Sequence, residues 1–280
     1  MATSSDVLES LRGDLALEHG AILQYVVHAV QLRDTALADP VKRIAREEMW
    51  HFEWLVEAIT ERGGEPTLER ADMFLSAAIG ESLREDVDTE KMALAHYAQT
   101  LEIVGDSDPD LTALIERIVD DERHHRARFG RLASQVERDG EEAYTATPCI
   151  QPSDLPVIGA AMVSEYAGIL TYLMNKYGSG DCEQGEQYFD LAIDEMRHAG
   201  WVAGHAAGMG IPQAPPVPLG TVAFVHSTGE AKAASERLEG MAESFYAAKT
   251  AEAGDPDLRD DMERAAAQHA YHRRQIGEMG

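Results

Sequence analysis

Cysteine and basic residues are scarce in this chain. Cys149 and Cys182 are the only cysteines among 280 residues, and they do not form a Cys-x-x-Cys motif. A disulfide framework and a thiolate metal site are therefore not encoded. Lys and Arg total 24 against 50 Asp and Glu, a formal net charge of −26. Because phosphate-rich partners require a basic surface, this charge disfavours nucleic acid as a partner.

The sequence also shows no targeting signal and no sign of a membrane-spanning segment. Residues 1–6 contain neither a basic nor an apolar targeting region, and we expect no apolar run of membrane-spanning length. Sustained β-type alternation is missing, whereas helical periodicity recurs almost throughout. We therefore expect a cytoplasmic, all-α protein without a membrane partner, long enough to bury two cores.

The most informative motif is Glu48-x-x-His51. Three residues apart on a helix, the two side chains stand one turn apart on the same face. They lie within the apolar seam that includes Ile44 and Leu55, so both are expected in the core. An ionised carboxylate in a core is costly unless a cation or hydrogen bonds compensate it.

Start and stop signals divide the first half into four helices. The first is expected to begin at a capping box of Asp6 and Glu9, and the second at Asp39, a cap followed by proline. A long connection covers about residues 65–80, and the fourth helix begins at Asp108, again before a proline. Short, long and short connections predict a four-helix bundle with a crossover between its second and third helices.

Each of these helices carries acid in its apolar seam. Glu18 lies on the first helix, Glu90 on the third, and the fourth repeats the motif as Glu122-x-x-His125. Counted from the turn near residue 106, Glu90 lies 16 residues before and Glu122 lies 16 after, so both are expected at one level of the bundle. Glu102 lies too near the turn and off the seam.

This set of residues resembles the diiron carboxylate site of the ferritin-like superfamily, especially bacterioferritin and rubrerythrin. One Glu from each of two helices and a Glu-x-x-His from each of the other two form a specific combination. The resemblance covers residues 6–138 and implies two iron ions, with manganese as the other metal that fits. By the resemblance, Glu48 and Glu122 bridge the metals, Glu18 and Glu90 are terminal carboxylates, and His51 and His125 each cap one metal.

Other residues are expected around this site. The family places an acid just before each motif glutamate, and Glu47 and Asp121 match, as partners for the outer nitrogens of the histidines. Tyr25 and Tyr97 each follow a terminal glutamate by seven residues, or two helical turns. They are candidates for hydrogen bonding or electron donation at the site, and core packing is the alternative.

An internal repeat doubles this pattern. Glu165, Glu195, His198 and His272 follow Glu18, Glu48, His51 and His125, respectively, by 147 positions each. The sequence thus predicts two tandem ferritin-like four-helix bundles, over residues 1–140 and 153–280, joined by a linker at 141–152. The second crossover is expected in the proline-rich residues 212–218.

The second half departs from the family pattern. His269 stands where Glu122 stands in the first half, and a neutral imidazole binds a metal through one nitrogen. Glu239 has the right depth, but the apolar stripe that includes Leu238 and Met241 is rotated away from it, which makes it a doubtful ligand. One metal, an asymmetric pair and no metal all remain open for the second half.

Three classes of function are compatible with these residues. The leading one is a non-haem diiron oxidoreductase that uses dioxygen or peroxide to oxidise a small organic substrate, with an electron donor as partner. The alternatives are a ferroxidase of the bacterioferritin type or a rubrerythrin-like peroxidase. In a third, non-catalytic class the second bundle serves as an internal dimer partner of the first. The chain is expected to be a monomer with two bundles or a homodimer.

Overall fold

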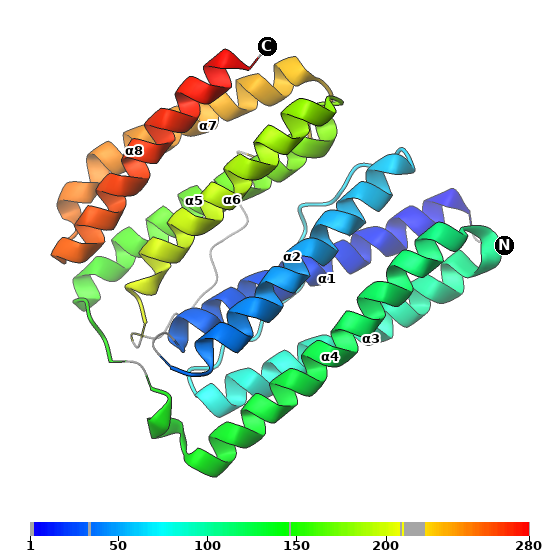
Figure 1. The fold of residues 1–280 in the computed structure, drawn as a ribbon, viewed down its shortest axis with the longest axis horizontal. Helices are drawn as coiled ribbons and strands as arrows, with labels where there is room; N and C mark the ends of the chain where they lie inside the picture. Colours follow the sequence, from blue (N-terminus) through cyan, green and yellow to red (C-terminus); the bar gives the residue numbers. More distant parts are fainter. Residues whose placement is uncertain (1–2, 33–34, 146, 208, 210–221, 280) are drawn as a thin grey trace. The chain divides into compact units, whose positions relative to one another are not determined.

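The computed structural model describes residues 3–32, 35–145, 147–207, 209 and 222–279. These residues form α-helices joined by turns and loops, without a β-strand in the described part of the chain. The chain divides into two compact units whose boundary lies between Thr147 and Pro148. Figure 1 shows each unit as a bundle of long helices, which confirms the all-α class and the tandem bundles.

The first unit contains four long helices. They are α1 (Ser4–Gln31), α2 (Ala38–Glu61), α3 (Ile79–Val104) and α4 (Pro109–Asp139). The contacts pair α1 with α2 and α3 with α4, and α1 also packs against α3. The crossover between α2 and α3 follows α1, because the Ala71 amide donates to the Ala16 carbonyl at 2.8 Å and the Phe74 amide donates to the Gln24 side chain at 2.8 Å. The predicted first crossover is therefore present.

The second unit repeats this arrangement. Its helices are α5 (Leu155–Gly178), α6 (Cys182–Gly204), α7 (Thr228–Lys249) and α8 (Pro256–Glu278). Here α5 pairs with α6, α7 pairs with α8, and α5 packs against α7. The predicted crossover at 212–218 lies outside the described residues. Within the predicted linker 141–152, the structure has a 3-10 turn at Glu141–Ala143.

Two predicted helix starts are wrong. The capping box of α1 is formed by Thr3 and Asp6, one turn before the predicted pair, because Thr3 accepts from the Asp6 amide and Asp6 accepts from the Thr3 amide. Asp39 does not cap α2, which begins at Ala38 after Leu37 without a side-chain cap. The predicted start of α4 is confirmed, with Asp108 as cap and Pro109 as the first helical residue.

Helix α5 corrects the expectation that no apolar run could reach membrane-spanning length. Among the described residues, Pro152–Gly178 is long and apolar enough to cross a membrane, with a mean hydropathy of 1.4. However, 67% of its apolar window is buried inside the protein, as in the central helix of a packed bundle. The apolar character of α5 is thus explained by the core of the second unit.

The cap of α4 is expected to stabilise the first unit measurably. The Asp108 carboxylate accepts from the Leu111 amide at 3.0 Å and from Arg62 Nη2 at 2.6 Å. Replacing Asp108 with alanine should lower the free energy of unfolding by about 1 to 2 kcal/mol, since a helix amide and a guanidinium both lose their acceptor. Urea unfolding followed by circular dichroism measures the change.

The pH dependence of this effect follows from the same contacts. The Leu111 amide, and after it the Arg62 guanidinium, hold the pKa of Asp108 below its ordinary 3.8. A carboxylate with a lowered folded pKa stabilises the protein above its unfolded pKa, and this contribution is lost as pH falls through the folded pKa. The Asp108→Asn control keeps an acceptor for the cap but has no charge. The difference between its free energy of unfolding and that of wild type should therefore disappear at low pH. A deficit that stays constant down to pH ~3 would contradict the electrostatic part.

Candidate metal centre

The four helices of the first unit bring the six predicted ligands together in its core. None of the six residues is more than 2% exposed. They are Glu18 on α1, Glu48 and His51 on α2, Glu90 on α3, and Glu122 and His125 on α4. Their spacing places these polar groups on the buried face of each helix.

The six side chains form two overlapping sets that could each hold a metal ion. Both sets contain Glu48 and Glu122, and within each set the ligand atoms lie within 4.8 Å of one another. Glu18 and His51 complete one set, while Glu90 and His125 complete the other. The two carboxylates predicted to bridge are thus the two that the sets share.

Both histidines turn the same ring nitrogen toward the carboxylates. His51 Nδ1 lies 2.8 Å from a Glu48 oxygen and 2.9 Å from a Glu122 oxygen, and His125 Nδ1 lies 2.8 Å from the other Glu48 oxygen. His125 Nε2 lies 2.7 Å from Glu47. An outer carboxylate that accepts the N–H of a histidine fixes the ring orientation and leaves the inner nitrogen free to bind metal.

The second predicted acid lies at the outer nitrogen of the other histidine. Asp121 approaches His51 Nε2 at 3.5 Å. Each acid thus faces the histidine of the neighbouring helix, because Glu47 is on α2 and Asp121 is on α4. Sequence spacing alone does not reveal this exchange between helices.

The two predicted tyrosines also reach across to a neighbouring helix. Tyr25 on α1 donates to Glu90 on α3 at 2.6 Å, and Tyr97 on α3 donates to Glu18 on α1. Both tyrosines are fully buried, and the Tyr25 ring also packs against Phe129 with 4.7 Å between ring centroids. They therefore hydrogen-bond the terminal carboxylates and pack in the core at the same time.

The charges in this cluster perturb one another strongly. Burial raises the pKa of Glu18 well above its ordinary value, and the charges of Glu122 and Glu48 raise it further. Burial has the same effect on Glu90, again reinforced by Glu122 and Glu48. Burial alone would lower the pKa of His125, but the Glu48 charge and hydrogen bonding with Glu122 raise it to about 11. Such crowding is what a bound cation relieves.

Several buried ligand atoms have no hydrogen-bond partner. They are both carboxylate oxygens of Glu48, Oε1 of Glu122, and Nδ1 of His51 and of His125. Buried polar atoms of native proteins are normally paired, so a group of unpaired carboxylate and imidazole atoms close to one another indicates a site that can bind a cation. This donor set of carboxylates and imidazoles fits iron or manganese.

The second unit assembles a related cluster with a different composition. Its two overlapping sets share Glu195 and His269. Glu165 and His198 complete one set, and Glu239 and His272 complete the other. The cluster thus contains three carboxylates and three imidazoles, all of them buried.

The predicted rotation of the packed face of α7 away from Glu239 is wrong, because Glu239 lies in this cluster. Glu239 is fully buried and lies 2.8 Å from His269 Nδ1, whereas Met241 is 53% exposed. The buried face of α7 runs through Ala242 and Tyr246 and carries Glu239 on its axis. The apolar stripe misled because short apolar side chains such as Ala242 define the packed face, and a long one such as Met241 does not.

Two pairs of a buried carboxylate and an imidazole in the first unit were not predicted. Asp14 lies 2.6 Å from His96 Nδ1, and Asp86 lies 2.7 Å from His28 Nδ1. Both aspartates are fully buried. The available signal was their spacing, since each precedes a terminal glutamate by four residues and shares its helix face.

The four-helix bundle with two shared carboxylates and two capping histidines defines the class of a dinuclear carboxylate protein. Residues 8–139 match the ferritin-like domain family. Bacterioferritin from Desulfovibrio desulfuricans is 32% identical over 140 residues, which are 48% of this chain and 78% of that protein. The chain therefore belongs to the ferritin-like diiron family.

Similarity extends to a hydroxylase and to a solved structure. The 3-demethoxyubiquinol 3-hydroxylase of Polaromonas sp. is 34% identical over 111 residues, 36% of this chain and 53% of that enzyme. The X-ray structure of the Desulfovibrio desulfuricans bacterioferritin, which has a diiron site, is 28% identical, with a TM-score of 0.47 over 53% of this chain and 96% of that one. The match spans about half the length of the hydroxylase.

Removing the outer carboxylate of His125 should weaken metal binding. Replacing Glu47 with glutamine removes the charge that fixes the His125 ring, so we expect iron affinity to fall by about 10- to 100-fold at one of the two positions. Anaerobic ferrous titration measures it. Glu57→Gln, an exposed acid on the same helix, is the control and should bind iron like wild type. An unchanged Glu47→Gln affinity would contradict the orienting role.

Proposed function

We propose that the first unit is a non-haem diiron oxidoreductase that uses dioxygen or peroxide to oxidise a small organic substrate. The observation that carries this proposal is the pair of overlapping ligand sets that share Glu48 and Glu122. Four carboxylates neutralise two ferrous ions, which makes a buried pair of ions tolerable in the core. Similarity to a hydroxylase, by its name an oxygen-inserting enzyme, supports the reaction class.

The protein groups have separate tasks in this proposal. Two iron ions bound there would supply the electrons that reduce the oxidant. Glu18 and Glu90 would each hold one of the ions, and Glu47 and Asp121 hold the histidine rings with Nδ1 inward.

The surroundings of the ligands control protons and water. Tyr25 donates its hydroxyl to Glu90, and Tyr97 donates its hydroxyl to Glu18. Each terminal carboxylate thus keeps a hydrogen-bond donor when its charge changes. Phe129, which is fully buried, packs against Tyr25 and helps to keep water away from this region. The chain thus offers fixed donors in a dry core, which is what a redox metal pair requires from the protein.

Ferroxidase activity is the second candidate, since bacterioferritins are among the similar proteins. An iron store assembles many identical single-bundle subunits into a closed shell. A chain that joins two unlike bundles does not favour such a shell. A rubrerythrin-like peroxidase uses the same type of metal site, but this chain lacks a Cys-rich electron-transfer module. The divergent second unit therefore favours the oxidoreductase.

The partners follow from this reaction. We infer a small organic substrate and a separate electron donor, because each turnover must return electrons to the iron. We also infer that the protein works in the cytoplasm, as a monomer with two bundles or as a homodimer. The net charge of −26 supports the absence of a nucleic acid partner.

Rapid mixing with excess ferrous iron and dioxygen distinguishes the candidates. The oxidoreductase should oxidise only the iron bound at its site, keep that iron bound, and stop unless a reductant and a substrate are supplied. The His51→Ala, His125→Ala double variant is the control without the site. Sustained oxidation of many ferrous ions per chain, with a soluble iron core in a large assembly, would instead establish a ferroxidase store.

A further inference from the structure

The buried cluster of the second unit is not a copy of the first site. His269 replaces the shared carboxylate Glu122, so three carboxylates remain where the first unit has four. Glu165 Oε2, Glu195 Oε1 and His272 Nδ1 are buried without a hydrogen-bond partner. Unpaired acceptors at this depth indicate a cation, and the changed composition indicates a different number of ions.

We propose that the second unit binds a single divalent transition-metal ion in one of its two overlapping sets. The ligands are two carboxylates and two imidazoles, namely Glu165, Glu195, His198 and His269. Two nitrogen and two oxygen donors suit zinc or ferrous iron in a four-coordinate site. The inference does not depend on the proposed function of the first unit.

The hydrogen bonding of His269 selects this set. His269 Nδ1 lies 2.8 Å from Glu239 Oε2 in a hydrogen bond, and Nε2 lies 3.3 Å from Glu165 Oε1. A neutral imidazole has one N–H and one lone pair. Since Glu239 accepts the N–H, the lone pair is on Nε2 and faces Glu165. A carboxylate that orients a metal-binding histidine in this way is common in metal sites.

His198 is oriented in the same sense by a neutral partner. His198 Nε2 lies 2.6 Å from Gln268 Oε1, which can only accept, so the proton is on Nε2 and the lone pair is on Nδ1. His198 Nδ1 lies 3.2 Å from Glu195 Oε2 and 3.3 Å from Glu165 Oε2. Ligands at ~2.0–2.1 Å from a tetrahedral ion lie about 3.3–3.4 Å apart, so these separations already fit one ion.

The other set would need His269 to bind through Nδ1, which is in the shorter hydrogen bond, with Glu239. The tyrosine contacts do not distinguish the sets, because Tyr246 donates to Glu165 as Tyr172 donates to Glu239. A second divalent ion would place four positive charges against three buried carboxylates. With one ion, a single negative charge is left over, and His272 Nδ1 lies 3.3 Å from Glu195 and 3.5 Å from Glu239. One ion therefore leaves the buried cluster better compensated.

A glycine makes room for one of the ligands. A Cβ atom at Gly168 would lie 2.8 Å from Glu195 Cγ, so any larger residue there would displace the Glu195 side chain. In the first half the matching position, 147 residues earlier, is Ala21. The second unit thus has no side chain at the position that faces Glu195, whereas the first unit has an alanine at the matching position.

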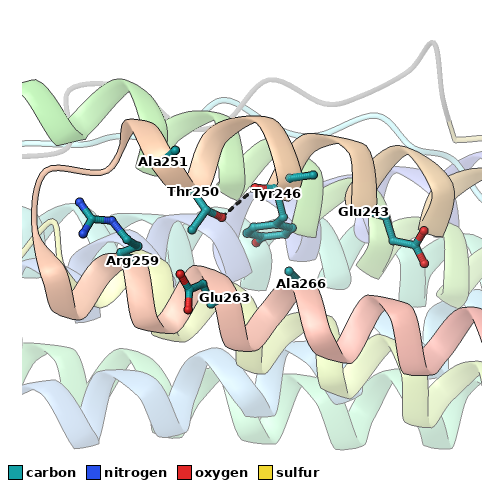
Figure 2. Close-up of a pocket in the computed structure, with 8 residues that line it drawn as sticks. Glu243, Tyr246, Thr250, Ala251, Arg259, Glu263 and Ala266 are labelled. Carbon is teal, nitrogen blue, oxygen red and sulfur yellow. Dashed lines mark hydrogen bonds between the residues drawn. The ribbon is translucent and has the colours of Figure 1, made fainter.

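A hollow in the second unit is lined by one residue that contacts these ligands. Its volume is about 590 Å³, and it lies between α7 and α8, with Glu243 and Glu263 on its walls (Figure 2). Tyr246, one of its lining residues, donates to Glu165 and stacks on His269 with 5.3 Å between ring centroids.

Cobalt titration of the full chain tests the inference. The background is the His51→Ala, His125→Ala variant, which disables the first site. It should bind one equivalent of Co²⁺ with the intense visible absorption of a four-coordinate ion. Adding His198→Ala, or the milder His198→Gln, should abolish that absorption and the bound equivalent, because His198 is a ligand of the proposed set. Adding His272→Ala should preserve both.

Three results would overturn the inference. The first is no bound cobalt in the background variant while circular dichroism shows the helices intact. The second is two equivalents in the second unit. The third is loss of cobalt with His272→Ala but not with the two His198 variants, which would place the ion in the other set. Each variant is checked by its melting curve, so a folding failure is recognised.

Discussion

Replacing His51 and His125 together with alanine should lower the ferrous iron bound to the chain by about two equivalents. Each histidine is the only imidazole of its set, and each turns Nδ1 toward the shared carboxylates. Without them, two ions would lie among carboxylates alone, which hold ferrous iron less selectively. Anaerobic equilibrium dialysis against ferrous iron measures the stoichiometry directly.

The matched control is His124→Ala. His124 is the exposed neighbour of His125 on α4, and its Nδ1 lies 2.6 Å from the Asp120 carbonyl, away from the ligand sets. It should bind iron like wild type. If disabling the second unit through His198 and His272 removed the same number of iron equivalents as the first double variant, the two sites would be equivalent and the proposed asymmetry would be wrong.

Metal should stabilise the first unit strongly. Without a cation, four carboxylates crowd one level of the core, and burial raises the pKa of Glu18 and of Glu90 well above ordinary values. An ion that binds only the folded state at 100 times its Kd adds about 2.7 kcal/mol, or roughly 10 °C in melting temperature for a unit of this size. Anaerobic calorimetry with ferrous or manganous ion measures the shift.

Glu90→Gln separates repulsion from metal binding. It removes one of the crowded carboxylates, so the metal-free variant should melt at a higher temperature than metal-free wild type. The same variant should gain less from added metal, because a ligand is lost. The His51→Ala, His125→Ala variant reports any shift that belongs to the second unit. A wild-type melting curve indifferent to both metals would exclude a buried site in the first unit.

The ligands themselves could be predicted because helix geometry is local. Glu48 and His51 share a face at a spacing of three on any α-helix, and the apolar seam around them shows that this face is buried. The repeat of 147 residues then locates the second cluster without any knowledge of packing. Helix pairing and the first crossover follow from the connection lengths for the same reason.

Helix ends and the rotation of α7 were harder to predict from the sequence. Thr3 rather than Asp6 caps α1, since several polar residues in succession can serve as a cap and the sequence does not rank them. On α7, Glu239 faces the cluster although Met241 and its apolar neighbours suggested another face. Packing against α5 and α8 decides that rotation, and small residues such as Ala242 carry little signal in a periodicity count.

The sequence by itself determined which residue types lie in each core and at which depth, because both depend on the period of a single helix. Only the tertiary structure decided which of them meet across helices: Tyr25 with Glu90, and Glu47 with His125. It also decided that His269 lies between two carboxylates, with Nδ1 at 2.8 Å from Glu239 and Nε2 at 3.3 Å from Glu165. Such partners depend on the axial shift and rotation between neighbouring helices, which side-chain packing sets and no local pattern records.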